Sequence, residues 1–358
     1  MDKKSTIRFP TSCFGNPKSK TCAESGRSIE NTKWLEFLAV VIAIVTFGAV
    51  AGAQQPAKIP RIGYLSGTGN ASNQGPYVDA LRQGLRELGY AEGKNIAIEY
   101  RGAEGKLDRF PGLVNELVQL KVDVLVVPVV SAARAAKNAT KTIPIVTITG
   151  DPVGAGIVDS LARPGGNLTG LATLNPNLSG KRLELLTEII PQLSRVGILR
   201  QPVPEDPNTT FEEYKVAARA LKIQFQSLEV HGPKPDLEQA FETAAKGRVN
   251  ALITVTSAPL FLQRKRIADL AIKNRLPSMY QGSAWVESCG LMSYSTDDLV
   301  IYRRAATYVD KILRGAKPAE LPIEQPTKFE LVINLKAAKQ IGLTIPPNVL
   351  ARADRVIR

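Results

Sequence analysis

Polar and small residues follow several short apolar runs of this chain, and these are the residues that could bind a small molecule. The apolar runs are expected to be strands of open α/β sheets, and in such sheets ligands bind outside the carboxyl ends of the strands. This rule selects residues from two series of strands that face one another. The candidate ligand-binding residues are Ser66, Gly67, Pro128, Ser131, Asp151, Thr256, Ser257, Tyr280 and Tyr294.

Ser131 and Asp151 offer opposite polarities on neighbouring loops of the first series. Ser131 begins a helical pattern, SAARAAKNA, and the unpaired N–H groups and positive dipole end of a helix start suit a carboxylate. Asp151 follows the next expected strand and could face an ammonium group. Both residues have a simpler interpretation as helix caps, with Pro152 in the first turn after Asp151. If both bind, the ligand is an amino acid or a similar small zwitterion.

Aromatic residues of the second half could cover the apolar part of such a ligand. We expect Tyr280 or Tyr294 to do so from across the cleft, which favours an amino acid with an aromatic or branched side chain. The alternative is that Tyr280, Trp285 and Tyr294 are plain packing residues. Tyr294 belongs to a returning segment, of which Ser293–Ser295 is expected to join the first lobe.

Residues for metal binding or catalysis are scarce. The chain has one histidine, His231, in a turn rich in Gly and Pro, and Cys289 is the only cysteine beyond the N-terminal apolar run. A His/Cys metal site or a His-based triad needs more such side chains. Gly67-Thr68-Gly69 resembles the start of a dinucleotide-binding loop, but residue 72 is Ser where the third glycine should stand. We therefore expect no cofactor, no metal site and no enzyme activity.

The charge of the chain also limits its partners. Lys and Arg outnumber Asp and Glu by 13, but they are spread in twos and threes, as in Arg264-Lys265-Arg266. Without a long basic run or interleaved aromatic residues, this pattern indicates a solvated surface and no nucleic-acid partner. No G-x-x-x-x-G-K-[ST] motif is present, so any ATPase must be a separate subunit.

Short strands alternate with amphipathic helices after residue 60. Apolar runs such as VDVLVVPVV do not alternate in polarity, which is typical of parallel strands covered on both faces. The sequence therefore predicts two doubly wound α/β lobes. The expected strands are Arg61–Ser66, Asn95–Tyr100, Val122–Val129, Ile143–Thr149 and Asn167–Ala172, then Arg195–Arg200, Gln224–Val230, Ala251–Thr256 and Pro277–Gln281, and finally Gly290–Ser295 and Phe329–Asn334, with a long helix over Asp298–Leu313.

The N-terminus is expected to direct export. Seven basic residues precede the apolar run Trp34–Ala53, which ends in Ala51-Gly52-Ala53, a sequence that signal peptidase accepts. We expect cleavage and a free periplasmic protein that begins near Gln54. The alternative is an uncleaved membrane anchor, since the run is almost long enough to span a bilayer.

Four ordered segments together resemble a known family. They are IGYLS at Ile62–Ser66, LRELGYAEGKNIAIEYR at Leu85–Arg101, GDPVGAGIVDSLARPGGNLTG at Gly150–Gly170, and Gly290–Pro346. The chain is similar here to ABC-transporter substrate-binding proteins of the type I periplasmic-binding-protein fold, in the tryptophan- and tyrosine-type branch. The resemblance implies two lobes joined by three hinge crossovers, with ligand in the cleft, closure by hinge motion, and an importer permease with ATPase subunits as partners.

The domain division follows from these expectations. It assigns 1–53 to a signal segment, 54–174 with 289–320 to lobe 1, and 175–288 with 321–358 to lobe 2. Crossovers are expected near Asn175–Asn177, Ser283–Cys289 and Pro318–Pro326. The expected function is small-molecule capture for an ABC importer by a monomer. The alternative is an exported α/β enzyme or sensor that acts on a small polar ligand; a transcription regulator of this fold would need a DNA-binding headpiece where the signal segment stands.

Overall fold

The computed structural model describes residues 58–202 and 209–358. The chain divides into the units Met1–Lys58 and Ile59–Arg358, and the fold described below is that of the second unit. The expected signal segment and its cleavage site lie outside the described residues. Among the residues described, no helix is both long enough and apolar enough to cross a membrane.

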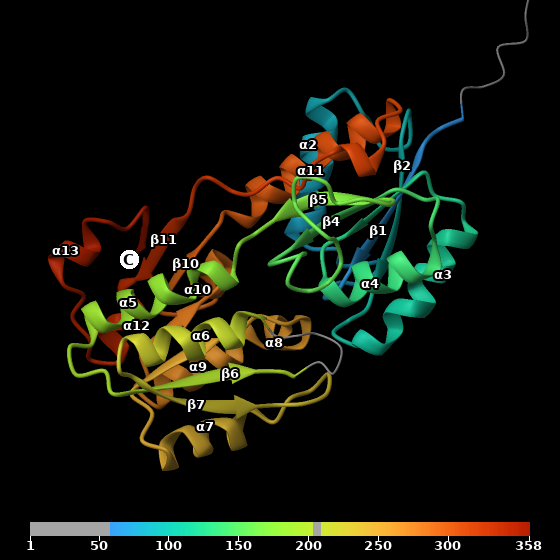
Figure 1. Cartoon of the computed structure of the whole chain (residues 1–358). Coiled ribbons are helices and arrows are strands. Elements are labelled where there is room, and N and C mark those ends of the chain that lie inside the picture. The colour runs from blue at the N-terminus through green and yellow to red at the C-terminus, as the bar shows by residue number, and fades with distance from the viewer. Residues whose placement is uncertain (1–57, 203–208) are drawn as a thin grey trace, which may run out of the picture. The chain divides into compact units, whose positions relative to one another are not determined.

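The first sheet contains five parallel strands in the order β2-β1-β3-β4-β5 (Figure 1). Its strands are β1 (Arg61–Ser66), β2 (Ala97–Gly102), β3 (Val124–Val127), β4 (Ile145–Thr149) and β5 (Leu168–Ala172). Its helices are α3 (Phe110–Gln119) and α4 (Val130–Ala139) on one face, and α2 (Pro76–Glu87) and α11 (Asp298–Leu313) on the other. β3 is apolar throughout because it enters two cores: Leu125 and Val127 pack with α3 and α4, whereas Val124 and Val126 pack with α2 and α11.

Within the described part of the chain, the second sheet has seven strands in the order β12-β11-β10-β9-β8-β6-β7, and only the β10–β11 pair is antiparallel. Its strands are β6 (Arg195–Arg200), β7 (Gln224–Glu229), β8 (Ala251–Thr254), β9 (Ser278–Tyr280), β10 (Met292–Ser295), β11 (Glu330–Asn334) and β12 (Arg355–Ile357). One core contains residues of α5 (Ser179–Ile189), α6 (Thr209–Ala220), α12 (Leu335–Gln340) and α13 (Pro347–Leu350). The core on the other face contains residues of α7 (Leu237–Lys246), α8 (Ala258–Leu262), α9 (Arg264–Lys273) and α10 (Ser283–Glu287).

The predicted fold class, two parallel-dominated α/β lobes, is confirmed. Each expected strand overlaps an observed one, and the predicted helix Asp298–Leu313 has the bounds of α11. β12 is a further strand that the sequence pattern did not indicate. The helix expected after Asp151 is absent, since residues 152–156 form a turn.

The chain passes between the two sheets three times. The first passage follows β5 and includes the short 3-10 helix η2 (Pro176–Leu178), and the third follows η3 (Pro318–Glu320) and leads to β11. The second passage lies at Thr296–Asp297, between β10 and α11. The crossover expected at Ser283–Cys289 is therefore wrong, because these residues contain helix α10 and stay in the second lobe.

β10 also corrects an expectation. Ser293–Ser295 does not join the first lobe, because β10 pairs with β9 and β11 in the second sheet. Only the helix that follows, α11, packs on the first sheet. The remaining lobe boundaries stay a prediction.

Two local features fix where α11 begins and how closely it approaches α2. Asp297 caps α11, since its Oδ1 accepts hydrogen bonds from the N–H groups of Leu299 (2.9 Å) and Val300 (3.3 Å). On α2, a Cβ atom at Gly84 would lie 2.3 Å from the carbonyl oxygen of Arg303, so only glycine permits this contact. The cap makes Asp298 the first residue of α11, immediately after the second passage between the sheets.

Candidate functional site

A cavity of about 300 Å³ is lined by residues of both lobes. Most of its lining follows the carboxyl ends of strands, as the rule for open α/β sheets predicts. Seven of the nine sequence-predicted residues line it, and Tyr280 and Tyr294 do not. The seven are Ser66, Gly67, Pro128, Ser131, Asp151, Thr256 and Ser257.

Ser131 lies in the first turn of α4 and is its second residue. The helix is capped by Val129, and no side chain makes a capping hydrogen bond there. The interpretation of Ser131 as a helix cap is therefore wrong. The first N–H groups of a helix have no acceptor within the helix, so the cavity receives a positively polarised helix end.

Asp151 organises the loop after β4. Its Oδ1 accepts hydrogen bonds from the N–H groups of Val153 (3.1 Å) and Gly154 (2.8 Å) and closes a turn, not a helix. Ser66 has a similar role after β1, where its Oγ accepts the N–H groups of Thr68 (3.2 Å) and Gly69 (3.3 Å). Both side chains thus shape backbone at the edge of the cavity that they line.

Residues of the second lobe form a connected polar edge. Ser257 caps α8 by accepting the N–H group of Leu260 (3.4 Å), and its hydroxyl donates to Oε1 of Gln201 (3.1 Å). The backbone N–H group of Thr256 donates to Oε1 of Gln281 at 2.9 Å. This bond orients the Gln281 amide, and its Nε2 has no hydrogen-bond partner although Gln281 is only 7% exposed.

Gln281 and Thr149 are therefore further candidate ligand contacts. The Oγ1 of Thr149 is also buried without a partner, and both residues line the cavity. Buried polar groups are nearly always hydrogen-bonded in native proteins. Both groups can therefore form hydrogen bonds with a ligand in the cavity.

The two aromatic residues expected to cover the ligand, Tyr280 and Tyr294, do not line the cavity. Tyr280 is fully buried and stacks on Trp285, with ring centroids 5.0 Å apart. Tyr294 packs against Phe329 at 6.0 Å. The aromatic residues that line the cavity are Tyr64, Tyr77, Phe261, Trp285 and Tyr302. Tyr280 does not line the cavity, because its side chain in β9 is buried in the core with Trp285.

Asp298 is the least expected residue of the cavity. Its carboxylate lines the cavity, and its Oδ2 accepts a hydrogen bond of 3.3 Å from the hydroxyl of Tyr77. Burial away from water raises the pKa of Asp298 to about 7. Its position at the start of a helix resembles an ordinary cap, and this is why the sequence did not reveal it.

The charged side chains that line the cavity are acidic. Among the residues described, the cavity is lined by two carboxylates, Asp151 and Asp298, and by no Lys, Arg or His side chain. Residues 58–202 and 209–358 also hold no cluster of His, Cys, Asp and Glu that could bind a metal ion. The cavity can therefore offer carboxylates to a cation, a helix end to an anion, and aromatic walls to an apolar group.

Solved structures and a characterised protein resemble this chain. A conserved domain protein from Vibrio cholerae O1 biovar El Tor is 30% identical, with a TM-score of 0.77 over 84% of this chain and 100% of that chain. An ABC domain from Streptococcus pneumonia, solved in complex with L-Trp, is 26% identical, with a TM-score of 0.76 over 83% of this chain and 99% of that chain. A tyrosine-binding protein of Clostridioides difficile (strain R20291) is 25% identical over 285 residues, which are 75% of this chain and 78% of that protein.

A family model covers most of the chain. The model for "ABC transporter substrate binding protein" matches residues 73–357, which include parts of both sheets and both sides of the cavity. The resemblance seen in the sequence is thereby confirmed. This chain belongs to the family of ABC transporter substrate-binding proteins.

Proposed function

We propose that this chain is the extracytoplasmic substrate-binding component of an ABC importer and that it captures an amino acid with an aromatic or branched side chain. The single observation that carries the proposal is the cavity between the lobes, which combines a helix start, carboxylates and aromatic walls. A zwitterion with an apolar side chain complements all three. The tyrosine-binding protein and the L-Trp complex among its relatives support the same ligand class.

The proposed ligand-binding residues surround the ligand from both lobes. The carboxylate lies at the start of α4, near Pro128 and Ser131, where backbone N–H groups are available. Ser66, Gly67 and Asp151 border it in the first lobe, and Thr256 and Ser257 do so in the second. Nε2 of Gln281 donates a hydrogen bond to the ligand, and Oγ1 of Thr149 donates or accepts one.

Export and partners belong to the same proposal. The chain is exported by its N-terminal segment, loses residues 1–53, and acts in the periplasm as a monomer with a permease and a separate ATPase. Intact-mass measurement of the native protein should give a chain that begins near Gln54. Recovery of the full-length chain in the membrane fraction would contradict cleavage.

A thermal-shift screen tests the ligand class. The purified protein is scanned against amino acids, sugars and nucleosides, because a ligand that binds only the native state raises its melting temperature. We expect the largest shifts with L-tyrosine, L-tryptophan or a branched amino acid. Shifts confined to sugars or nucleosides would contradict the amino-acid assignment and leave a binding protein of another specificity.

A further inference from the structure

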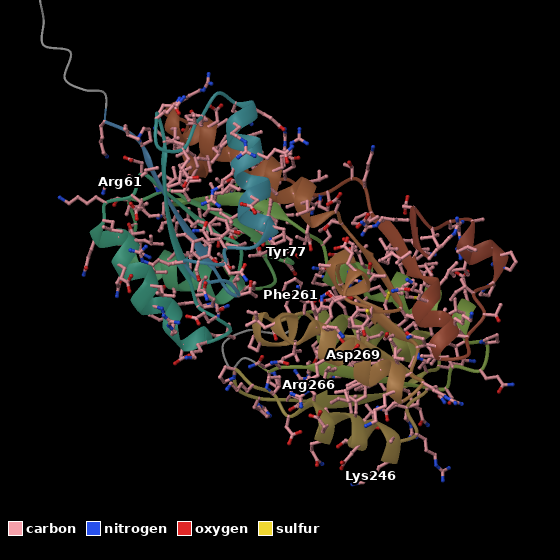
Figure 2. All side chains as sticks on the ribbon, turned by 180° about the vertical axis from the view of Figure 1, so that it is seen from behind. Arg61, Tyr77, Lys246, Phe261, Arg266 and Asp269 are labelled. Atoms are coloured by element: carbon pink, nitrogen blue, oxygen red, sulfur yellow. The ribbon has the colours of Figure 1, made fainter. Side chains whose placement is uncertain are left out.

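Asp298 stands among aromatic rings from both lobes. Tyr77 of α2 and Tyr302 of α11 stack with ring centroids 4.6 Å apart, and Tyr77 lies 6.0 Å from Phe261 of α8. Phe261 in turn contacts Trp285 edge-on at 5.9 Å. Figure 2 labels Tyr77 and Phe261, which lie next to one another on the two lobes. All four rings line the cavity that Asp298 also lines.

The carboxylate of Asp298 has no cationic partner within the described part of the chain. No Lys or Arg there forms an ion pair with it, and its one hydrogen bond comes from the neutral hydroxyl of Tyr77 at 3.3 Å. Nearby acids, Asp297 and Glu330, add to the effect of burial in raising its pKa, and the Tyr77 hydrogen bond and Arg182 only partly oppose them. A desolvated carboxylate without a counter-ion is unfavourable, and a bound cation would relieve this cost.

We propose that Asp298, Tyr77, Tyr302 and Phe261 form a subsite that binds a positively charged amine of the ligand. The proposal rests on the proposed function, in that the ligand is a small molecule held in this cavity. An ammonium group gains an ion pair from the carboxylate and a cation–π contact from the Tyr77 or Tyr302 ring. Phe261 borders the subsite as an apolar wall, because its ring already has the guanidinium of Arg264 4.6 Å from its centroid. The subsite is completed only when residues of α2, α8 and α11 meet, so the amine is bound by both lobes.

Asp151 is the competing carboxylate, and its surroundings differ. Oδ1 of Asp151 already accepts two backbone N–H groups, at 3.1 and 2.8 Å, and the charge is satisfied by the turn that it closes. The carboxylate of Asp298 accepts a single hydrogen bond, from Tyr77, so a bound ammonium would stabilise it more than it would stabilise Asp151. The amine is therefore assigned to Asp298, and the carboxylate of an amino acid to the start of α4.

Titration calorimetry with matched ligands tests the subsite. The probes are L-tyrosine and L-tryptophan, the amines tyramine and tryptamine, and the acids 3-(4-hydroxyphenyl)propionate and indole-3-propionate, which lack the amine. Each is titrated into the wild type, Asp298→Asn and Asp297→Asn at pH 8. Asp297→Asn removes the same charge from the neighbouring residue, and asparagine retains the helix cap.

The wild type should bind amine-bearing probes about ten- to a hundredfold more tightly than the acids that lack the amine. Asp298→Asn should lose most of that preference, whereas Asp297→Asn should keep it. Equal amine affinities in wild type and Asp298→Asn, with both folded by circular dichroism, would overturn the subsite and leave the proposed function intact. Binding of tyramine and tryptamine but of neither amino acid would support the subsite and contradict amino-acid capture. If no amine-bearing probe binds the wild type, the subsite is overturned and the proposed function loses its aromatic amino acids.

Discussion

The guanidinium of Arg182 donates a hydrogen bond of 2.7 Å from Nε to the backbone carbonyl of Tyr294. Arg182 is fully buried on α5, and its other nitrogens donate to Asn175 and to the hydroxyl of Tyr214. Asn175 lies in the first passage between the sheets, and Tyr294 lies just before the second. One buried side chain therefore holds together two of the three connections on which any closure of the lobes depends.

Replacing Arg182 with Met should lower the free energy of unfolding by about 3 kcal/mol, because several buried acceptors lose their donor at once. Urea unfolding followed by circular dichroism measures this. Lys181→Met is the matched control, since Lys181 forms a solvent-accessible ion pair with Glu184, and should change stability by about 0.5 kcal/mol or less. A loss below that of the control would show that Arg182 does not stabilise the passages.

Asp298 should make stability depend on pH in a defined direction. Burial raises the pKa of its carboxyl from 3.8 to about 7 in the folded protein. The stability that the protonated carboxyl contributes is therefore fully present below about pH 4 and is lost as the pH rises through 7. Relative to Asp298→Asn, the wild type should lose on the order of 2 kcal/mol between pH 4 and pH 8. If the free energies of unfolding of the two proteins, measured by urea unfolding, change with pH in the same way, the raised pKa of Asp298 is contradicted.

Gln281→Glu should weaken amino-acid binding about tenfold without lowering stability by more than about 1 kcal/mol. Glutamate keeps an oxygen for the N–H group of Thr256, but it replaces the unpartnered Nε2 donor with an acceptor. Calorimetry and thermal unfolding measure the two effects separately. Gln340→Glu, on the exposed end of α12, introduces the same charge and should bind as the wild type does. An unchanged affinity in Gln281→Glu would remove Gln281 from the site.

Asp151→Asn separates the two carboxylates of the cavity. Asparagine can accept the same N–H groups of Val153 and Gly154, so the turn should survive. If Asp298 binds the amine, this substitution should change the affinity for the best amino acid less than about threefold. A loss of ten- to a hundredfold in calorimetry would instead assign the ammonium to Asp151, as the sequence pattern first indicated.

The sequence predicted the fold more fully than the site. Continuous apolar runs such as that of β3 reveal buried parallel strands, whereas β12 is too short, at three residues, and too polar at Arg355 to stand out. The rule for strand ends found seven lining residues because it depends only on chain order within a lobe. The lobe to which β10 belongs depends on pairing with distant β11, which no local pattern encodes.

The aromatic residues that line the cavity could not be predicted from the sequence for a related reason. Tyr77, Phe261 and Tyr302 lie on three helices far apart in the chain, and each has the helical spacing of an ordinary packing residue. Asp298 follows the residue that caps the helix, Asp297. From the sequence alone, either of these adjacent acidic residues could cap the helix and either could line a cavity. Only the packing of α11 on α2 beside the second lobe distinguishes them.

The central claim is that the cavity captures an amino acid and releases it unchanged. Titration of the purified protein with the best amino acid from the thermal screen, followed by mass spectrometry of the recovered ligand, tests it most directly. We predict saturable binding of one ligand per chain and recovery of the ligand with its mass unaltered. Two results would contradict the claim. One is the absence of a heat of binding with every aromatic and every branched amino acid titrated, and the other is recovery of the ligand as a product of different mass.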